Sequence, residues 1–459
     1  MDFSSANTAL WNPIIQIGII AGLILGANVL RRKFAFVRKS LMPTAVLAGF
    51  VLLLLRSLGW VPISATFLEI VTYHGIAIGF IALSLRVSEK KDPNAAAVGC
   101  QSGALIVSTY LVQALVGLFV SLGVAFTFMP DFFKAGGILL PMAYGQGPGQ
   151  ANNVGSTYES LGMVGGRSFG LSLAAMGYLC ACVVGVIFLF VWNRTGKLKR
   201  SKEGKQISGS VTVDAFQDEN EAPISESVDR LSVQVAIVCL VYLLTYLLID
   251  GVVVLLETVA PGLAATVSSL LWGFNFIVGS MLASVVALIF KGLRKCRIMK
   301  HQYQNNYLLS RISGLAFDVM IVCGIASIDI GDLADNWVPF LLMAVIGGVG
   351  TFLYLFYICK RIYPGYVYEA FFSMFGMLTG TISSGVLLLR EIDPNMETPA
   401  SNNLITGSSF GIIFGIPMLL IIGFAPKNIY TVLITLGIVV VYLALLLALI
   451  FRLNKKKTK

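Results

Sequence analysis

Eleven apolar stretches, each long enough to cross a lipid bilayer as a helix, follow one another along the chain. A membrane-spanning helix needs about 20 apolar residues. Of the 459 residues, 57% are hydrophobic and only 12% are charged, which is too little charge to cover a water-soluble protein of this length. We therefore predict an all-α integral membrane protein with eleven transmembrane helices, near 13–30, 41–59, 66–85, 98–127, 167–192, 233–256, 262–290, 308–329, 337–359, 405–425 and 430–451.

The distribution of basic residues predicts the orientation of these helices, because cytoplasmic loops carry an excess of Lys and Arg. Suppose that the N-terminus lies outside and that two glycine-rich segments, near 135–165 and 364–391, return to the side from which they came. All but four of the 33 Lys and Arg residues then fall in cytoplasmic loops; the four are Arg56, Lys134, Arg167 and Lys427. We expect a multi-pass protein of the plasma membrane with its C-terminus in the cytoplasm.

The same arrangement contains an internal repeat. Four spans, one interrupted segment and a fifth span occur twice, and an odd number of crossings inverts the second copy relative to the first. Inverted repeats with interrupted helices are typical of secondary transporters. The predicted parts are a first inverted repeat at 1–192, a flexible cytoplasmic linker at 193–232, a second inverted repeat at 233–425 and an extra C-terminal helix with a basic tail at 426–459.

Two glycine-rich stretches interrupt the apolar pattern: YGQGPGQANNVGST (144–157) and MLTGTISSG (377–385). Broken backbone at membrane depth persists only where it lines a polar cavity or is packed by protein. We predict that each stretch is the tip of a re-entrant hairpin, the first entering from outside and the second from the cytoplasm. Helix N-termini at such tips attract anions, and carbonyl, hydroxyl or amide oxygens suit sodium. The alternative is a kink or a close helix contact through small residues.

The candidate substrate- and ion-binding residues of the two tips are Gln146, Gly147, Gly149, Asn152, Asn153, Ser156, Thr157, Thr379, Gly380, Thr381, Ser383 and Ser384. Two charged residues join them, because ionisable groups inside the membrane are costly and often functional. Asp318, in the middle of a span, could coordinate a cation, carry a proton or bond to a neighbouring helix. Arg167, after the first tip, could meet a substrate carboxylate or anchor its helix at the interface. The sodium candidates are Asn152, Asn153, Ser156, Thr381, Ser383 and Asp318.

Five stretches resemble the bacterial sodium–glutamate symporter family: PTAVLAGFVLLLL (43–55), ILLPMAYGQGPGQANNVGSTYESLG (138–162), GRSFGLSLAAMGYL (166–179), FFSMFGMLTGTISSGVLLL (371–389) and GSSFGIIFGIPMLLIIG (407–423). The resemblance implies a sodium-coupled L-glutamate symporter that works as a homodimer by an elevator-like movement of the hairpins against a scaffold. The sequence departs from the family at both tips. It has Gly145-Gln146-Gly147 where the family has Gly-His-Gly, and Gly380 and Thr381 fall in the region of the family's Ala-Thr-Pro-Thr run.

The chain lacks the H-E-x-x-H and P-loop motifs, so we expect transport without ATP hydrolysis, and no cofactor other than sodium as the coupling ion. We expect no enzymatic activity and no nucleic-acid partner. Two other functions fit the same sequence. One is a carrier for another carboxylate, such as a citrate-like or 2-hydroxy acid, coupled to protons through Asp318. The other is a passive channel or a sensor, since opposed re-entrant hairpins also line channels.

Overall fold

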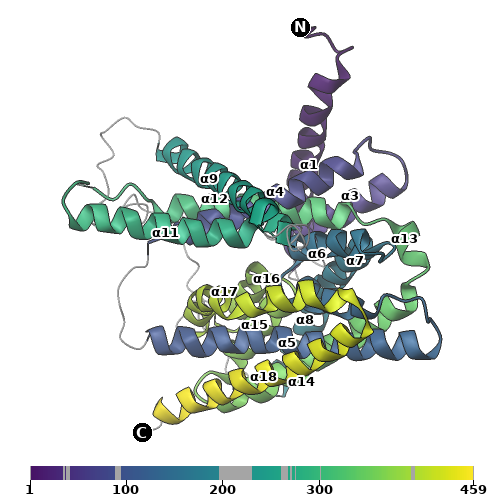
Figure 1. Cartoon of the computed structure of the whole chain (residues 1–459), viewed down its shortest axis with the longest axis vertical. Helices are drawn as coiled ribbons and strands as arrows, with labels where there is room; N and C mark the ends of the chain where they lie inside the picture. The colour runs from purple at the N-terminus through teal and green to yellow at the C-terminus, as the bar shows by residue number, and fades with distance from the viewer. Residues whose placement is uncertain are drawn as a thin grey trace. The chain divides into compact units, whose positions relative to one another are not determined.

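The computed structural model describes residues 2–34, 37, 42–87, 95–195, 230–259, 267–268, 271–273, 275–299, 301–393 and 398–457 (Figure 1). The predicted linker 193–232 falls almost wholly outside these residues. The elements are all helices: α1 (Thr8–Lys33), α3 (Thr44–Ser57), α4 (Ala65–Ser84), α5 (Ala95–Thr127), α6 (Pro148–Ser160), α7 (Gly166–Leu179), α8 (Gly185–Arg194), α9 (Arg230–Val259), α11 (Asn275–Lys295), α12 (Asn306–Ala326), α13 (Ile330–Ala334), α14 (Trp337–Ile362), α15 (Val367–Thr379), α16 (Ile382–Arg390), α17 (Ala400–Phe424) and α18 (Ile429–Lys457).

Ten helices within the described residues are long and apolar enough to cross a membrane, so the chain is a multi-pass membrane protein by helix length and hydropathy. One of the ten is a continuous rod in which a π-helical turn at Cys180–Val184 joins α7 to α8. The eleventh predicted span, 41–59, is represented by α3, which has 14 residues. Pro43 precedes α3, and Gly59, with φ +70°, follows its end. At 1.5 Å per residue, α3 covers about 21 Å, less than the hydrocarbon core of about 30 Å.

The chain forms two compact units. Unit 1 comprises Met1–Glu69, Asp92–Lys205 and Ile321–Lys459, and unit 2 comprises Ile70–Lys91 and Gln206–Met320. Two of the boundaries between the units fall inside α4 and α12. Each unit contains residues from both predicted repeats, and the repeats stay a prediction.

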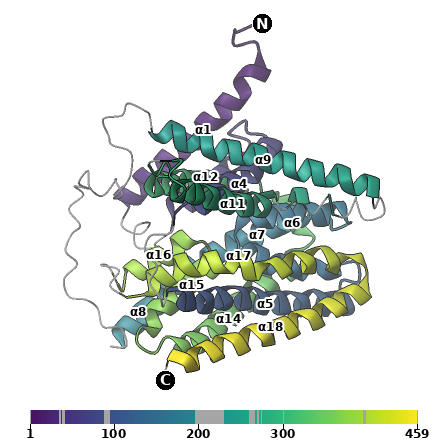
Figure 2. The same cartoon turned by 60° about the vertical axis from the view of Figure 1, so that its left-hand side comes forward.

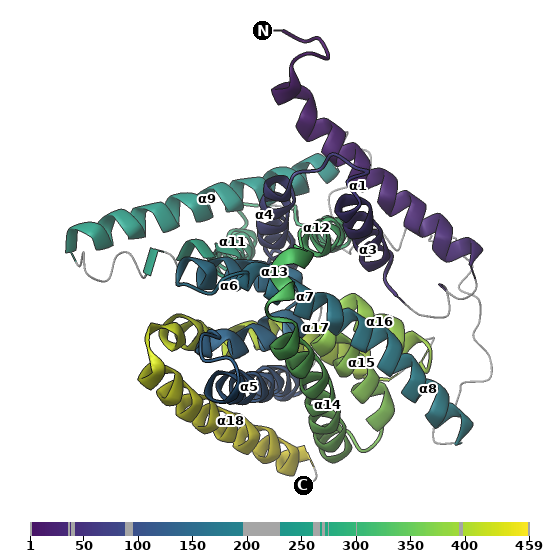
Figure 3. The same cartoon turned by 90° about the vertical axis from the view of Figure 1, so that its right-hand side faces the viewer.

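Helix α5 forms the centre of unit 1. Figures 2 and 3 show it between α17 and α18, and α14 also packs against it. Its polar side chains are buried and make hydrogen bonds to α14 and to the residue that follows α14. Ser102 shares a hydrogen bond with the Tyr363 hydroxyl (2.8 Å), and the Tyr354 hydroxyl donates to Ser108 (2.7 Å). Because these groups are satisfied within protein, a polar helix face is tolerated in an apolar interior.

The short segments of unit 1 pack through glycines. A β-carbon at Gly117 of α5 would overlap the carbonyl oxygen of Gly137, which lies in a 3₁₀ turn at Lys134–Ile138. A β-carbon at Gly155 of α6 would lie 2.6 Å from the Cα of Arg167 on α7. These positions therefore let backbones approach one another closely, as small residues do between membrane helices.

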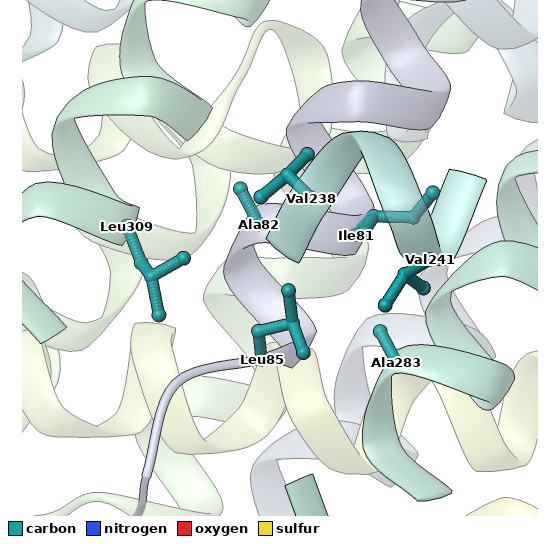
Figure 4. Close-up of a cluster of buried hydrophobic side chains, with 7 residues drawn as sticks. All are labelled: Ile81, Ala82, Leu85, Val238, Val241, Ala283 and Leu309. Carbon is teal, nitrogen blue, oxygen red and sulfur yellow. The ribbon is translucent and has the colours of Figure 1, made fainter. Parts of the chain in front are cut away.

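Unit 2 is built from parts of α4 and α12 together with α9 and α11. Its buried core consists of Ile81, Ala82, Leu85, Val238, Val241, Ala283 and Leu309 (Figure 4). A β-carbon at Gly79 of α4 would overlap the ring of Phe317 on α12, so these two helices are in close contact. A hydrogen bond joins the end of α4 to the segment before α12: the Gln304 side chain donates to the Leu85 carbonyl (2.8 Å).

Candidate functional site

The first glycine-rich stretch contains one short break. A π-helical turn at Pro141–Gly145 leads to Gln146 and Gly147, and α6 begins at once with Pro148. Gly147 has φ +88° and ψ −174°, a combination that is essentially limited to glycine. Proline is well suited to the first helical position, where its missing N–H would have no partner in the helix. The break is thus shorter than the predicted tip at 144–157, and the residues on α6 include Gly149, Asn152, Asn153, Ser156 and Thr157.

The second stretch contains a matching break. Helix α15 ends at Thr379, Gly380 and Thr381 leave the helical conformation, and α16 begins at Ile382. The two arms lie against each other, since a β-carbon on Gly376 would be 2.8 Å from the Cα of Gly385. The arms of the first segment also run back along each other, because the rings of Phe133 and Tyr158, near their outer ends, have centroids 5.4 Å apart. Both segments are therefore helical hairpins.

The two breaks meet within unit 1, although more than 200 residues separate them in the sequence. A β-carbon on Gly147 would lie 3.8 Å from the Gly380 carbonyl oxygen and 3.9 Å from the Thr381 methyl group. The Tyr178 hydroxyl of α7 would also lie 3.8 Å away. Because α6 and α16 both begin here, the free N–H groups and positive dipole ends of two helices are brought to one place.

Buried polar atoms without a partner occur in several parts of the described chain, and seven of them lie on the segments that form this meeting point. They are Gln113 Oε1 on α5, both side-chain polar atoms of Gln150 and Asn152 Oδ1 on α6, Ser172 Oγ on α7, and Thr381 Oγ1 and Ser384 Oγ at the second break. Gln150 is 1% exposed and Ser384 is 2% exposed. An unpaired buried polar group costs about 1–3 kcal/mol, so such groups are rare, and a bound ligand is one of the few reasons to retain them. Most of these atoms are oxygens, which suit a hard cation or an N–H donor.

Gln113 lies beside residues that precede each break. Its Nε2 donates to the Leu378 carbonyl of α15 (2.8 Å) and to the Thr351 hydroxyl of α14 (3.0 Å). A β-carbon on Gly145, just before the first break, would be 2.9 Å from Gln113 Oε1. Gln113 therefore makes a hydrogen bond to the second hairpin and packs against Gly145 of the first hairpin.

Other predicted residues already have partners. Arg167 forms an ion pair with Glu69, and its backbone N–H donates to the Glu159 carboxylate (3.0 Å). The Thr379 hydroxyl donates to the Phe375 carbonyl (2.8 Å), within its own helix. Two predicted residues of α6 bond locally: Thr157 donates to the Asn153 carbonyl (2.9 Å), and the Asn152 side-chain nitrogen donates to the Asn153 side chain (3.5 Å).

Two predicted residues, Asp318 and Ser383, stay predictions. Asp318 lies in the part of α12 that belongs to unit 2, where its side chain is exposed, whereas both breaks belong to unit 1. The Ser383 side chain lies outside the described side chains, although its backbone is part of α16. Within the described part of the chain, no group of three or more His, Cys, Asp or Glu residues could hold a metal ion.

Sequence reasoning missed Gln113, Gln150 and Ser172. Gln150 lies inside the quoted stretch 144–157, and its place one turn after Gly147 is the signal that could have identified it. Gln113, in the middle of span 98–127, is also an unusual polar residue for a membrane helix. A glutamine that only makes a hydrogen bond to a neighbouring helix gives the same sequence pattern, however. No known protein-family model matches the sequence, and a comparison with curated proteins gives no significant match.

Proposed function

We propose that the chain is a secondary active transporter that couples the uptake of a small organic anion to sodium. L-glutamate is the first candidate substrate, because of the resemblance of both hairpins to those of sodium–glutamate symporters. In this proposal the two hairpins are re-entrant, α3 is a short eleventh membrane helix, the two halves are inverted repeats, the N-terminus lies outside, and the chain acts as a homodimer in the plasma membrane. An elevator-like movement of the hairpins gives alternating access.

The observation that carries this proposal is the meeting of two helix breaks beside unpaired buried polar atoms. In a bilayer, unsatisfied backbone and side-chain groups cost several kcal/mol, so they are retained where they line a binding site. The N-termini of α6 and α16 supply N–H groups for a carboxylate, as helix N-termini do for other anions. The oxygens of Asn152, Thr381 and Ser384 are suitable ligands for sodium.

The pairing of Arg167 refines the proposal. Because Glu69 already neutralises the Arg167 guanidinium, a substrate carboxylate would have to displace an ion pair to reach it. Binding of the anion by two helix N-termini needs no such displacement. We therefore assign the carboxylate to the helix N-termini and regard Arg167 as a residue that holds α7 to α4.

The test is uptake into proteoliposomes of purified protein with a panel of labelled acids: L-glutamate, L-aspartate, citrate and L-lactate, each with and without an inward sodium gradient. The proposal expects one of the acids to accumulate above its external concentration only when sodium is present. Accumulation driven by a proton gradient instead would favour a proton-coupled carrier. Equilibration without accumulation, whatever the gradient, would indicate a channel and contradict the proposal.

A further inference from the structure

Gln113 lies next to both hairpins but belongs to neither of them. It lies on α5, which is outside both hairpins, and it is 1% exposed. Its amide nevertheless contacts the last turn of α15 and faces the residue before the first break. One side chain therefore contacts residues of both hairpins close to their breaks.

The hydrogen-bond network fixes which end of the amide points where. The Leu378 carbonyl can only accept, and the Thr351 hydroxyl already donates its proton to the Gly347 carbonyl (2.7 Å). Both neighbours therefore require a donor, and both N–H groups of the Gln113 amide are used. The oxygen Oε1 is left as a buried acceptor without a donor.

This oxygen lies beside Gly145, the residue before the first break. The absence of a side chain at Gly145 leaves room for it, because a β-carbon there would lie 2.9 Å from Oε1 and would also overlap the Tyr110 ring. The break that follows ends at the N-terminus of α6, which attracts negative charge. An acceptor beside an anion-attracting helix end is complementary to a molecule that carries both a carboxylate and an ammonium group.

We propose that Gln113 is a specificity-determining residue that selects amine-bearing carboxylates. Its Nε2 holds the second hairpin, and its Oε1 accepts a hydrogen bond from the substrate ammonium. The inference rests on the proposed function and adds to it the residue that distinguishes an amino acid from a carboxylic acid of the same length without an amine. The shared chemistry would also allow Oε1 to bind sodium, and the experiment distinguishes the two cations.

The experiment compares L-glutamate with glutarate, which has the same carbon chain and both carboxylates but no ammonium group. Inhibition of labelled L-glutamate uptake gives an apparent affinity for each acid in proteoliposomes of wild type, Gln113→Met and Gln101→Met. Gln101 is the matched control, since it is another fully buried glutamine on α5 and donates to the Ile450 carbonyl (3.3 Å). The sodium concentration for half-maximal uptake is measured in parallel.

We expect wild type to prefer L-glutamate and Gln113→Met to reduce that preference by about 10- to 150-fold, the range for a hydrogen bond to a charged group. Gln101→Met should keep the wild-type preference. A merely structural role for Gln113 would weaken both acids equally, and that result would overturn the proposal. So would an unchanged preference with a raised sodium requirement, which would assign Oε1 to sodium. If wild type accumulates neither acid but moves another, the glutamate assignment fails; if it moves both equally, only the role of Gln113 fails.

Discussion

Replacing Ser384 with alanine should have opposite effects on the empty protein and on ligand binding. The Ser384 hydroxyl is buried and has no hydrogen-bond partner, and it lies next to the second break, 2.9 Å from where a β-carbon on Gly380 would be. Removing an unsatisfied buried hydroxyl relieves a penalty of about 1–3 kcal/mol, and the lost packing offsets part of this gain. We expect the free energy of unfolding of the empty protein to stay the same or rise by up to about 2 kcal/mol.

The same substitution removes a ligand if the meeting point of the breaks binds substrate and sodium. A hydrogen bond to a charged group contributes about 1.5–3 kcal/mol, so apparent affinity should fall by about 10- to 150-fold. Thermal unfolding in detergent without sodium or substrate measures the first effect. Uptake titrations with sodium and with L-glutamate measure the second.

Ser373→Ala is the matched control. Ser373 is also a fully buried serine of the second hairpin, but its hydroxyl donates to the Ala370 carbonyl (3.0 Å) within the helix. We expect this variant to lose about 0.5–1.5 kcal/mol of stability and to keep wild-type affinities. The reasoning is refuted if Ser384→Ala behaves like Ser373→Ala, with lower stability and unchanged uptake constants.

Three further substitutions test the geometry around the breaks. Gly177→Ala should destabilise the protein by about 1–3 kcal/mol, because its β-carbon would overlap the Thr379 carbonyl oxygen, whereas Gly123→Ala, with nothing within 4 Å, should be neutral or slightly stabilising in the same thermal assay. Gly147→Ala should cost about 1–3 kcal/mol despite the open space beside it, because φ is +88°, and wild-type thermal stability would show that the break has another conformation. Asp318→Asn should leave the sodium concentration for half-maximal uptake within about twofold of wild type, since Asp318 is exposed and the proposed sodium ligands are the buried oxygens of Asn152, Thr381 and Ser384; a tenfold rise would place Asp318 in the sodium site.

Hydropathy and backbone chemistry were sufficient to predict the all-helical architecture and ten of the membrane helices. The stretch 41–59 forms α3, which is shorter than the predicted span because Pro43 and Gly59 bound it on both sides. The position of both breaks was also predictable, since glycine-rich polar sequence is unusual between apolar helices. Their extent was not, because the residues after Pro148 have weak helix propensity but gain packing against α7 through glycine contacts.

The partners of individual side chains could not be read from the sequence. Arg167 and Glu69 are 98 positions apart, so their ion pair depends on the tertiary arrangement. Gln113 has the sequence pattern of an ordinary interhelical hydrogen-bonding residue, and only the contacts with Leu378 and Thr351 reveal which end of its amide is left unpaired. Polar groups in a membrane protein therefore divide into satisfied and unsatisfied sets only once the fold is known.

Reciprocal flux in proteoliposomes of wild-type protein tests sodium coupling most directly. Radioactive sodium is followed while an inward gradient of L-glutamate is imposed with equal sodium on both sides. Coupling is mutual by thermodynamic necessity, so the glutamate gradient should drive net sodium entry although the sodium concentration is equal on both sides. Sodium entry that is the same with and without L-glutamate, in vesicles that do accumulate L-glutamate, would contradict sodium-coupled symport.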